Sequence, residues 1–303
     1  GAPAGTKGLS LFIVPKIRFD GKANDVRCTK IEEKMGIHGQ ATCELTFGTN
    51  GDCLGTLIGK EFDGMANMFI MMNEARLLCG VQGESQSNMA YMLTEQYARE
   101  RGQFGKEIIH HPDVKRTLIK MRSMSRALRA LVLYTANLFD RVHHGEKNLQ
   151  DEIAFLTPIC KAYCSDEGFQ VAVDAIQVHG GYGFCSEYGI EQFARDTKIA
   201  TIYEGTNGIQ AIDFTMRKVL KDNAKTFMIV GAKIQKSIAH PIAQENFKEE
   251  IGMIVKNLEK AQAIMQKFGT LAAQNKMDTI LFHATNFLAY SGNLVASWRL
   301  LDS

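Results

Sequence analysis

One carboxylate, Glu204, stands in a setting that suits a catalytic base. The segment 177–210, QVHGGYGFCSEYGIEQFARDTKIATIYEGTNGIQ, places it after a glycine-rich turn and an Arg/Asp/Lys cluster, where a loop meets a helix. Thr206 is predicted to cap that helix, which leaves Glu204 just outside the positive helix end. The residues that approach it are mostly apolar: Ile199, Ala200, Ile202 and Tyr203. This pattern indicates a partly buried carboxylate that could remove a weakly acidic C–H proton.

The same position also suits a surface carboxylate that pairs with the positive end of a helix. From these few residues alone, that plainer role for Glu204 is the more frequent one. The apolar approach favours the base, because it indicates a partly buried site and not a solvated rim. The local sequence leaves both interpretations open.

The glycine-rich turn HGGYG at 179–183 resembles nucleotide-binding loops in composition only. The dinucleotide fingerprint opens a helix after a strand, whereas this turn follows a predicted helix, so a Rossmann-type site is excluded. Gly180 and Gly181 can stop the preceding helix in a left-handed turn. They also allow the backbone to approach a ligand closely, and the structural role is at least as frequent as the functional one.

Two further groups of polar residues have structural and functional alternatives. The segment 101–106, RGQFGK, places two cations and two glycines at the end of a predicted helix, which completes a helix C-terminus. The same group could grip a phosphate and stack on an aromatic ring. Arg76 lies inside a Met-rich apolar helix face, where it needs either an anion or an exit to solvent, and an exit to solvent is the default.

Composition and residue spacing exclude several classes of function. The chain has 35 Lys and Arg against 33 Asp and Glu, so it has no basic excess for nucleic acid. No run approaches the ~20 apolar residues of a membrane span. The histidines lack metal-ligand spacing and no Ser or Cys has a recognisable catalytic partner, so we assign no metal and no nucleophile. Seven cysteines without CxxC spacing, among them Cys160 and Cys164 one helical turn apart, predict reduced core thiols in a cytoplasmic protein.

The elements that must position these residues are of two kinds. Residues 8–60 contain short β-branched runs separated by Gly, Asp and Asn, which predicts an antiparallel β segment. After Gly64, apolar residues at helical spacing predict long helices at about 65–101, 112–144, 157–179, 206–222, 246–268 and 277–300. Pro112 and Pro158 are each predicted at a first helical position. The predicted fold class is α+β and mostly α, a helical bundle with a small sheet packed against it.

With these segments in order, the chain resembles the acyl-CoA dehydrogenase family of FAD flavoproteins over residues 8–222. The resemblance rests on the intervals between four segments and on their residues: KGLSLFIVP, ARERGQFGK, QVHGGYGF and RDTKIATIYEGT. The YEGTNGIQ segment, the HHP after RGQFG and the long helical tail look most similar to the larger bacterial branch that includes 3-methylmercaptopropionyl-CoA dehydrogenase. The implied domains are the C-terminal part of a middle β domain at 1–61, a C-terminal helical bundle at 62–222 and a helical extension at 223–303.

The resemblance implies a role for each candidate residue. Glu204 would remove the α-proton of an acyl-CoA thioester while the β-hydrogen leaves as hydride to flavin N5. The residues implied to contact FAD, some of them across a dimer, are Arg101, Gln103, Phe104, Gln177, Gly180, Gly181, Thr206 and Gly208. Those implied to bind the substrate are Asn73, Arg76 and Gly205. The chain departs from the family pattern at Pro112, where a Gln is frequent, and at Gly208, where a polar side chain is common.

The resemblance also implies partners. They are an acyl-CoA substrate, an electron-transfer flavoprotein or similar acceptor, and further copies of the chain in a homodimer or homotetramer. The N-terminal helical domain and the first half of the β domain, which carry the isoalloxazine-binding segment, are not in these 303 residues. We therefore expect a C-terminal fragment that need not hold FAD or turn over alone. Two alternatives are an acyl-CoA oxidase or other flavin enzyme on the same fold, and a non-enzymatic helical oligomerisation module.

Overall fold

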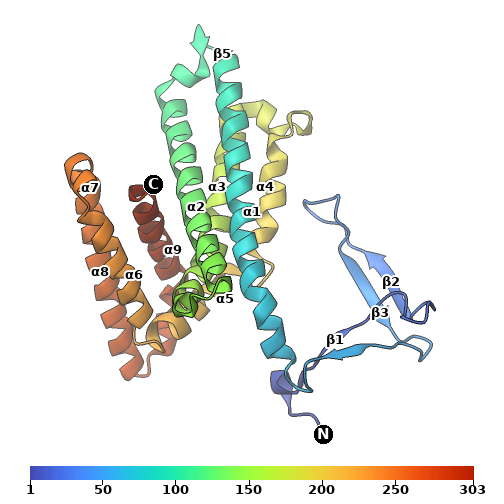
Figure 1. Ribbon diagram of the computed structural model, residues 1–303. Coiled ribbons are helices and arrows are strands. Elements are labelled where there is room, and N and C mark those ends of the chain that lie inside the picture. Colours follow the sequence, from blue (N-terminus) through green and yellow to red (C-terminus); the bar gives the residue numbers. More distant parts are fainter. The chain divides into compact units, whose positions relative to one another are not determined.

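The computed structural model describes residues 1–303, which form two compact units, Gly1–Ala75 and Arg76–Ser303 (Figure 1). The first unit contains short strands and the start of the longest helix. The second is helical apart from one small hairpin. The α+β, mostly α fold predicted from the sequence is confirmed. The domain boundaries predicted after residues 61 and 222 stay predictions.

The first unit is built from two antiparallel strand pairs: β1 (Leu11–Ile13) with β4 (Thr56–Ile58), and β2 (Val26–Ile31) with β3 (Cys43–Phe47). Asn24 links the loops beside them. Its side-chain amide donates to the carbonyls of Pro15 and Leu54 at 2.8 Å each, and its Oδ1 accepts from Leu54 N at 2.9 Å. A buried Asn that satisfies backbone groups in this way holds loops that have no ladder of their own.

Most of the second unit consists of long helices. In chain order the elements are α1 (Gly64–Glu100, which begins in the first unit), the hairpin strands β5 (Gly102–Gln103) and β6 (Lys106–Glu107), α2 (Pro112–His143), α3 (Gln150–His179), α4 (Ile190–Lys198), α5 (Asn207–Asp213), a π-helical stretch Phe214–Leu220, α6 (Lys225–Ile238), α7 (Pro241–Asn246), α8 (Lys248–Ala273) and α9 (Met277–Leu301). Short 3₁₀ turns lie at Gly5–Gly8, Ile108–His110, Lys147–Leu149, Gly180–Phe184, Ser186–Tyr188 and Ile199–Thr201. None of the helices has the combination of length and apolar character needed to cross a membrane.

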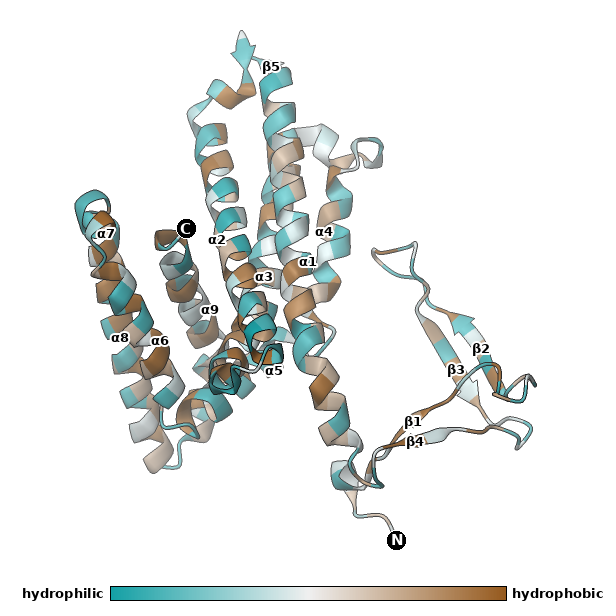
Figure 2. Ribbon diagram, in the orientation of Figure 1, coloured by the Kyte–Doolittle hydropathy of each residue, from teal (hydrophilic) through white to brown (hydrophobic).

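Helix α2 shows how the apolar pattern determines burial. Pro112 stands at its first turn, as predicted, where the missing N–H has no intrahelical partner to lose. Hydrophobic and hydrophilic residues alternate around the helix (Figure 2). Most of its buried positions recur at three and four residues, with Ala127 and Leu131 beside them: Leu118, Met121, Ser125, Leu128, Val132, Thr135 and Leu138. This single buried stripe is the face that α2 packs against its neighbours.

The prediction that Pro158 starts a helix is wrong. Helix α3 begins at Gln150, and Pro158 lies inside it. A proline in a helix interior costs about 3 kcal/mol, because it removes one hydrogen bond and crowds the preceding turn. The preceding residues Ile153, Phe155 and Leu156 are almost fully buried, so tertiary packing supplies the stabilisation that keeps this turn helical.

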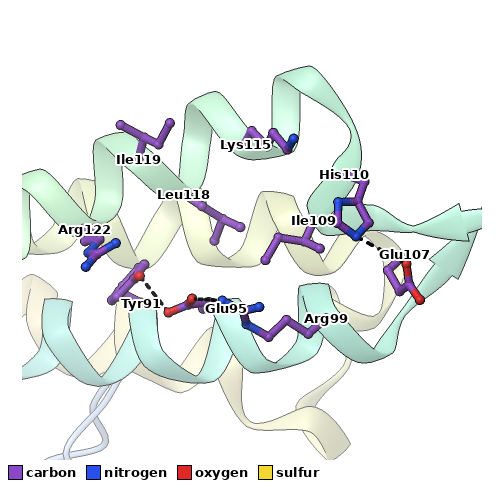
Figure 3. A pocket seen from close by; sticks show the side chains of 10 residues that line it. All are labelled: Tyr91, Glu95, Arg99, Glu107, Ile109, His110, Lys115, Leu118, Ile119 and Arg122. Atoms are coloured by element: carbon purple, nitrogen blue, oxygen red, sulfur yellow. Dashed lines mark hydrogen bonds and ion pairs between the residues drawn. The ribbon is translucent and has the colours of Figure 1, made fainter.

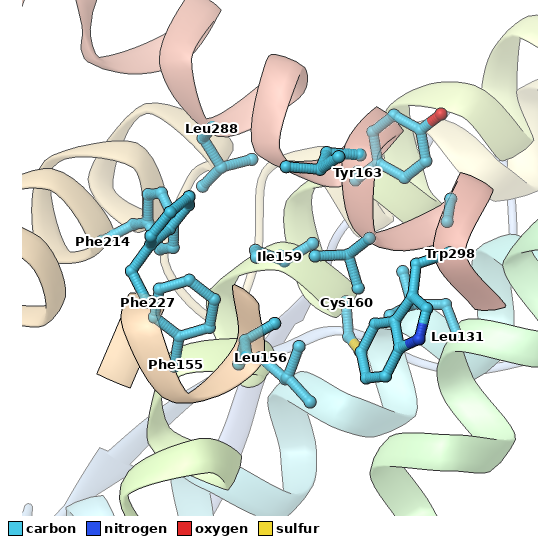
Figure 4. Packing of buried hydrophobic residues seen from close by; sticks show 14 of the residues in the cluster. Leu131, Phe155, Leu156, Ile159, Cys160, Tyr163, Phe214, Phe227, Leu288 and Trp298 are labelled. Carbon is cyan, nitrogen blue, oxygen red and sulfur yellow. The ribbon is translucent and has the colours of Figure 1, made fainter. Parts of the chain in front are cut away.

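The main core lies around α3 (Figure 4). Phe155 packs against Phe214 and Phe227, with ring centroids 5.0 and 6.3 Å apart. From α9, Trp298 stands edge-on to Tyr134 of α2 at 5.3 Å, and its indole N–H donates to Ser237 Oγ of α6 at 2.9 Å. The C-terminal helices therefore complete the same core as α2 and α3, and do not form a separate cluster.

Helices α1 and α3 cross with their backbones in contact. A Cβ added to Gly83 would lie 2.2 Å from the carbonyl oxygen of Cys164, and one added to Gly168 would lie 2.4 Å from the carbonyl oxygen of Gly83. At Gly80 the nearest atom would be the carbonyl oxygen of Cys160, at 2.9 Å. Only glycine allows two helices to approach so closely. This crossing brings the middle of α1 directly onto the part of α3 that lies behind Glu204.

Candidate active site

Glu204 occupies a strained turn at the start of α5. Its φ is +58°, in the left-handed region that a residue with a Cβ seldom adopts, and Gly205 follows at +87°. Thr206 is the N-cap, as predicted, and its hydroxyl accepts from the Ile209 N–H at 3.3 Å. Left-handed backbone at a non-glycine residue costs about 1 kcal/mol or more, so the surrounding contacts must hold it in place.

Two side chains hold this turn through its main-chain oxygens. Arg76 Nε donates to the Glu204 carbonyl at 3.3 Å, and Gln210 Nε2 donates to the carbonyls of Glu204 and Gly205, each at 3.3 Å. Gln210 is fully buried. Arg76 is half-buried, so the default expectation of a side chain that leaves the helix for solvent is not what the structure shows. It satisfies a carbonyl at the turn instead.

The cap gives a direct test of how much the turn depends on local bonds. Replacing Thr206 with Ala is expected to lower the free energy of unfolding by about 1 kcal/mol, because one backbone N–H of α5 loses its acceptor. Thr206→Ser keeps the hydroxyl and is expected to stay close to the wild type. Urea denaturation of both variants checks this, and equal losses in the two would show that the hydroxyl is not what stabilises the turn.

The turn also exposes groups that could act on a ligand. The Glu204 side chain is half-buried, and its backbone N–H makes no hydrogen bond within the chain. Gly205 is constrained on its other side, because an added Cβ would lie 2.9 Å from Gln210 Nε2. A carboxylate and an unpaired N–H on one rigid turn provide a proton acceptor beside a hydrogen-bond donor for a developing negative charge.

Below the turn lies a residue that the sequence analysis missed, Lys161 of α3. Its side chain is fully buried, and Nζ donates to Asn207 Oδ1 at 2.8 Å. Burial is the main cause that lowers the pKa of Lys161 to about 8, and burial also raises the pKa of the nearby Cys79 thiol. A signal was present in the sequence, because PICKAYC places one Lys in an apolar stretch.

Helix α1 also contacts the chain that leads to the turn. Tyr203 OH donates to Gln82 Oε1, and Gln82 Nε2 donates to the Asp196 carbonyl at 3.4 Å. Burial is the main cause that raises the pKa of Tyr203 to about 12, so its hydroxyl keeps its proton and remains a donor. With Arg76, these contacts place the Glu204 turn against one side of α1.

A separate cavity of about 550 Å³ collects five of the eight residues predicted to contact a cofactor: Arg101, Gln103, Phe104, Gly180 and Gly181. The Arg101 guanidinium lies 4.9 Å above the Tyr182 ring, and Tyr97 stacks on His179 with centroids 4.1 Å apart. The Phe104 ring is 92% exposed. The remaining three residues lie outside this lining: Gln177 is exposed on the last turn of α3, and Thr206 and Gly208 belong to the Glu204 turn.

The glycines of this cavity end helix α3, as predicted, but Gly180 is not in the left-handed helical region. Its φ of +63° is combined with a ψ of −138°, a conformation essentially restricted to glycine. The chain then continues as a 3₁₀ turn through Phe184. A Cβ at Gly180 or Gly181 would meet nothing within 4 Å, so the backbone at both residues is open to a ligand.

Another cleft, of about 450 Å³, lies between α1 and α2 (Figure 3). It contains none of the predicted site residues. Its central charges are paired with one another: Tyr91 OH donates to Glu95 Oε2 at 2.7 Å, and Arg99 Nη2 donates to Glu95 Oε1 at 2.6 Å. The bond from Tyr91, followed by that from Arg99, lowers the pKa of Glu95. We assign no ligand to this cleft.

Asn73, the third residue predicted to bind substrate, belongs to the first compact unit, where its side chain is exposed. Its assignment to substrate binding stays a prediction. Of the three residues predicted to bind substrate, Arg76 and Gly205 are in the second unit and lie together at the Glu204 turn.

Comparison with known proteins decides the family. A family model described as the C-terminal domain of acyl-CoA dehydrogenase matches residues 63–219, which is more than half of the chain. The chain belongs to the acyl-CoA dehydrogenase family. The resemblance inferred from the sequence motifs is therefore confirmed.

Two curated relatives each match 99% of this chain. The broad-specificity linear acyl-CoA dehydrogenase FadE5 of Mycobacterium tuberculosis is 34% identical and is covered over 54% of its own length. The 3-methylmercaptopropionyl-CoA dehydrogenase of Ruegeria pomeroyi is 35% identical and is covered over 53%. The chain thus spans about half the length of the curated relatives it matches.

A solved structure supports the same assignment. The acyl-CoA dehydrogenase of Bacillus anthracis complexed with FAD superimposes with a TM-score of 0.73 at 25% identity, over 95% of this chain and 53% of that one. The agreement covers nearly the whole chain, so it includes the C-terminal helices as well as the part that the family model matches.

Proposed function

We propose that the protein to which this chain belongs carries out FAD-dependent α,β-dehydrogenation of an acyl-CoA thioester, with Glu204 as the base that removes the α-proton. The observation that carries this proposal is the Glu204 turn, a half-buried carboxylate held in left-handed backbone beside its own unpaired N–H. Because the chain belongs to the acyl-CoA dehydrogenase family, we interpret the Glu204 carboxylate as the base for the α-proton of an acyl-CoA. The proposal concerns the whole protein, because the chain spans about half of its relatives.

The α-hydrogen of a thioester becomes acidic only when the enolate oxygen is stabilised. An N–H aimed at that oxygen and a carboxylate aimed at the α-carbon meet the two requirements at once. In this turn both groups belong to Glu204, and its main-chain carbonyl is fixed by Arg76 and Gln210. Fixing the backbone fixes the directions of both the N–H and the side chain, which is the preorganisation that the reaction needs.

The residues around the 550 Å³ cavity fit part of a dinucleotide cofactor. Arg101 offers a guanidinium for a phosphate, Phe104 offers an exposed ring for stacking, and Gly180 and Gly181 leave open backbone. We infer that these residues hold FAD, with Gln103 and Gln177 beside them, and that Thr206 and Gly208 contact it near the base. FAD, when bound, supplies the acceptor for the β-hydrogen and its electron pair.

Replacing Arg101 with Ala tests this assignment. The variant is expected to bind FAD roughly 10- to 100-fold more weakly, because hydrogen bonds to charged groups contribute about 1.5–3 kcal/mol. The measurement is flavin retained by the full-length protein after dialysis. Arg99→Ala is the matched control, since Arg99 lies two residues away but is paired with Glu95 in the other cleft. Equal loss of flavin in both variants would contradict a specific role for Arg101.

Several finer assignments rest on the same proposal. The substrate would contact Arg76 and Gly205 at the turn, with Asn73 as the third predicted contact. An electron-transfer flavoprotein or similar acceptor would reoxidise the flavin, in an enzyme of fatty acid β-oxidation that is a homodimer or homotetramer. All seven cysteines are free thiols, which supports the proposed cytoplasmic location. The prediction that they are core thiols is wrong for Cys28, Cys43 and Cys185, which are exposed.

The proposed activity is tested on the full-length protein with a panel of straight-chain acyl-CoA thioesters under anaerobic conditions. Bleaching of the flavin absorbance that recovers only after an electron-transferring partner is added is the expected result. Rapid formation of peroxide with O₂ would instead identify an oxidase on the same fold. No bleaching with any acyl-CoA, by a preparation that retains flavin, would contradict the proposal.

A further inference from the structure

Lys161 is a charged side chain with no exposure to solvent, in the middle of α3. It lies between two buried thiols, Cys160 and Cys164. Taking an ammonium group out of water is costly unless other groups compensate it. The α3 side chains one helical turn further on, Cys164 and Ser165, are uncharged, so they do not compensate the ammonium. Lys161 lies below the Glu204 turn, and its hydrogen bond goes to the helix that starts there.

The hydrogen bonds of Lys161 connect α3 to the first residue of α5. Its Nζ donates to Asn207 Oδ1 at 2.8 Å, and Asn207 Nδ2 donates to Ser165 Oγ at 3.0 Å and to the Ala162 carbonyl at 3.2 Å. Asn207 follows the N-cap directly and is itself buried. The amide is therefore held from both ends by α3, and the helix that starts at the turn cannot rotate or slide without breaking these bonds.

Four titratable or charged groups face Lys161 from the elements packed around it. Arg76 and Cys79 come from α1, Asp166 from the next turn of α3, and Glu204 from the turn. Burial keeps the Cys79 thiol in its neutral form. The negative charges of Asp166 and Glu204 favour the ammonium form of Lys161, and Arg76 opposes it.

We propose that Lys161 is a positioning residue for the α-proton base: through Asn207 it fixes the first turn of α5, and with it the backbone of the turn that carries Glu204. This inference rests on the proposed function, because it assigns Lys161 to that same site. It goes beyond that function by assigning a role to a buried residue that makes no contact through solvent-exposed atoms.

The main test is the rate of α-hydrogen exchange into D₂O, measured with an acyl-CoA and the full-length flavoprotein. The exchange rate is followed against acyl-CoA concentration at one pH. In Lys161→Met, the rate at saturating acyl-CoA is expected to fall roughly 10- to 100-fold, because the turn that carries the base loses its anchor and a misplacement of about 1 Å can cost that much. The acyl-CoA concentration that gives half the maximal rate is expected to stay within a few-fold of the wild type, because Lys161 is fully buried.

Lys233→Met is the matched control. Lys233 also donates to a buried partner, the Glu152 carboxylate, but it lies in α6. Its loss is expected to lower stability while leaving the saturated exchange rate near the wild-type value. A Lys161→Met rate equal to that of the wild type, or an equal fall in Lys233→Met, would overturn the inference. A wild type that holds flavin but exchanges no α-hydrogen would contradict the proposed function itself.

Two further measurements bear on the inference, and the first does not require Lys161→Met to fold. Asn207→Ala removes the acceptor of the Lys161 ammonium, so its saturated exchange rate is expected to fall by a similar factor; an unchanged rate counts against the inference. The pH dependence of stability gives a readout that does not depend on activity. Folded Lys161 loses its proton near pH 8 and the unfolded chain keeps it to about 10.4, so the stability of the wild type should rise relative to that of Lys161→Met between these values. A flat difference would show that Lys161 is not buried in the folded protein, which would overturn the inference.

Discussion

Replacing Glu204 with Gln is expected to slow α-proton removal by about 10²- to 10⁴-fold, the range that a positioned general base contributes. Gln has nearly the same shape but cannot accept the proton. The fold should survive, because Arg76 and Gln210 hold the main-chain carbonyl of residue 204 and not its side chain. The measurements are α-hydrogen exchange into D₂O and the anaerobic rate of flavin reduction in the full-length protein.

A second carboxylate of the same segment provides the control for this substitution. Glu187 lies in the 3₁₀ turn Ser186–Tyr188 and is exposed. Glu187→Gln changes the net charge by the same amount and is expected to leave both rates near the wild-type values. If Glu204→Gln kept exchange within a few-fold of the wild type while retaining flavin, another group would have to be the base, and the proposed mechanism would fail.

Replacing Gly83 with Val is expected to destabilise the helical unit by on the order of 3 kcal/mol or more, at or above the upper end of the usual cost of overpacking. The added Cβ would lie 2.2 Å from the Cys164 carbonyl and 3.0 Å from the Ser165 Cα, both backbone atoms that cannot turn aside. Helix α1 would have to move away from α3. Because α1 also carries Arg76, the turn at Glu204 would lose one of its two supports, and activity should fall with stability.

The matched glycine is Gly252 in α8, where an added Cβ would meet nothing within 4 Å. Gly252→Ala is expected to raise the free energy of unfolding by about 0.5–1 kcal/mol, because Ala restricts the unfolded chain without strain in the helix. Urea denaturation of both variants in the same background measures the difference. A Gly83→Val protein as stable as the wild type would show that α1 and α3 do not cross in backbone contact.

Local patterns predicted the parts of this protein whose structure depends on local chemistry. The apolar spacing of α2, its initial Pro112 and the Thr206 cap follow from hydrogen bonds and packing within one or two helical turns. The start of α3 could not be predicted in this way. Buried neighbours keep Pro158 inside a helix that its own backbone disfavours, and those neighbours are distant in sequence.

The candidate site also has some features that the sequence indicates and others that only the structure shows. The sequence identified Glu204 as a carboxylate at a helix start and, through its motifs, gave the family to which the chain belongs. It also indicated that Arg101 and Gly180 belong to one functional group, and the structure places them around one cavity. Side chains with the chemistry that a reaction needs are visible in a sequence, because residue type alone determines what they can donate or accept.

Only the tertiary structure showed that Glu204 stands in left-handed backbone, with its carbonyl held by Arg76 from a helix 128 residues away. Only the structure placed Lys161 beneath that turn, since the crossing of α1 and α3 and the bond to Asn207 are long-range contacts. Sequence by itself determined which groups are available for proton transfer. Long-range packing decided how they are oriented and charged, because direction, burial and electrostatic neighbours are properties of the folded chain.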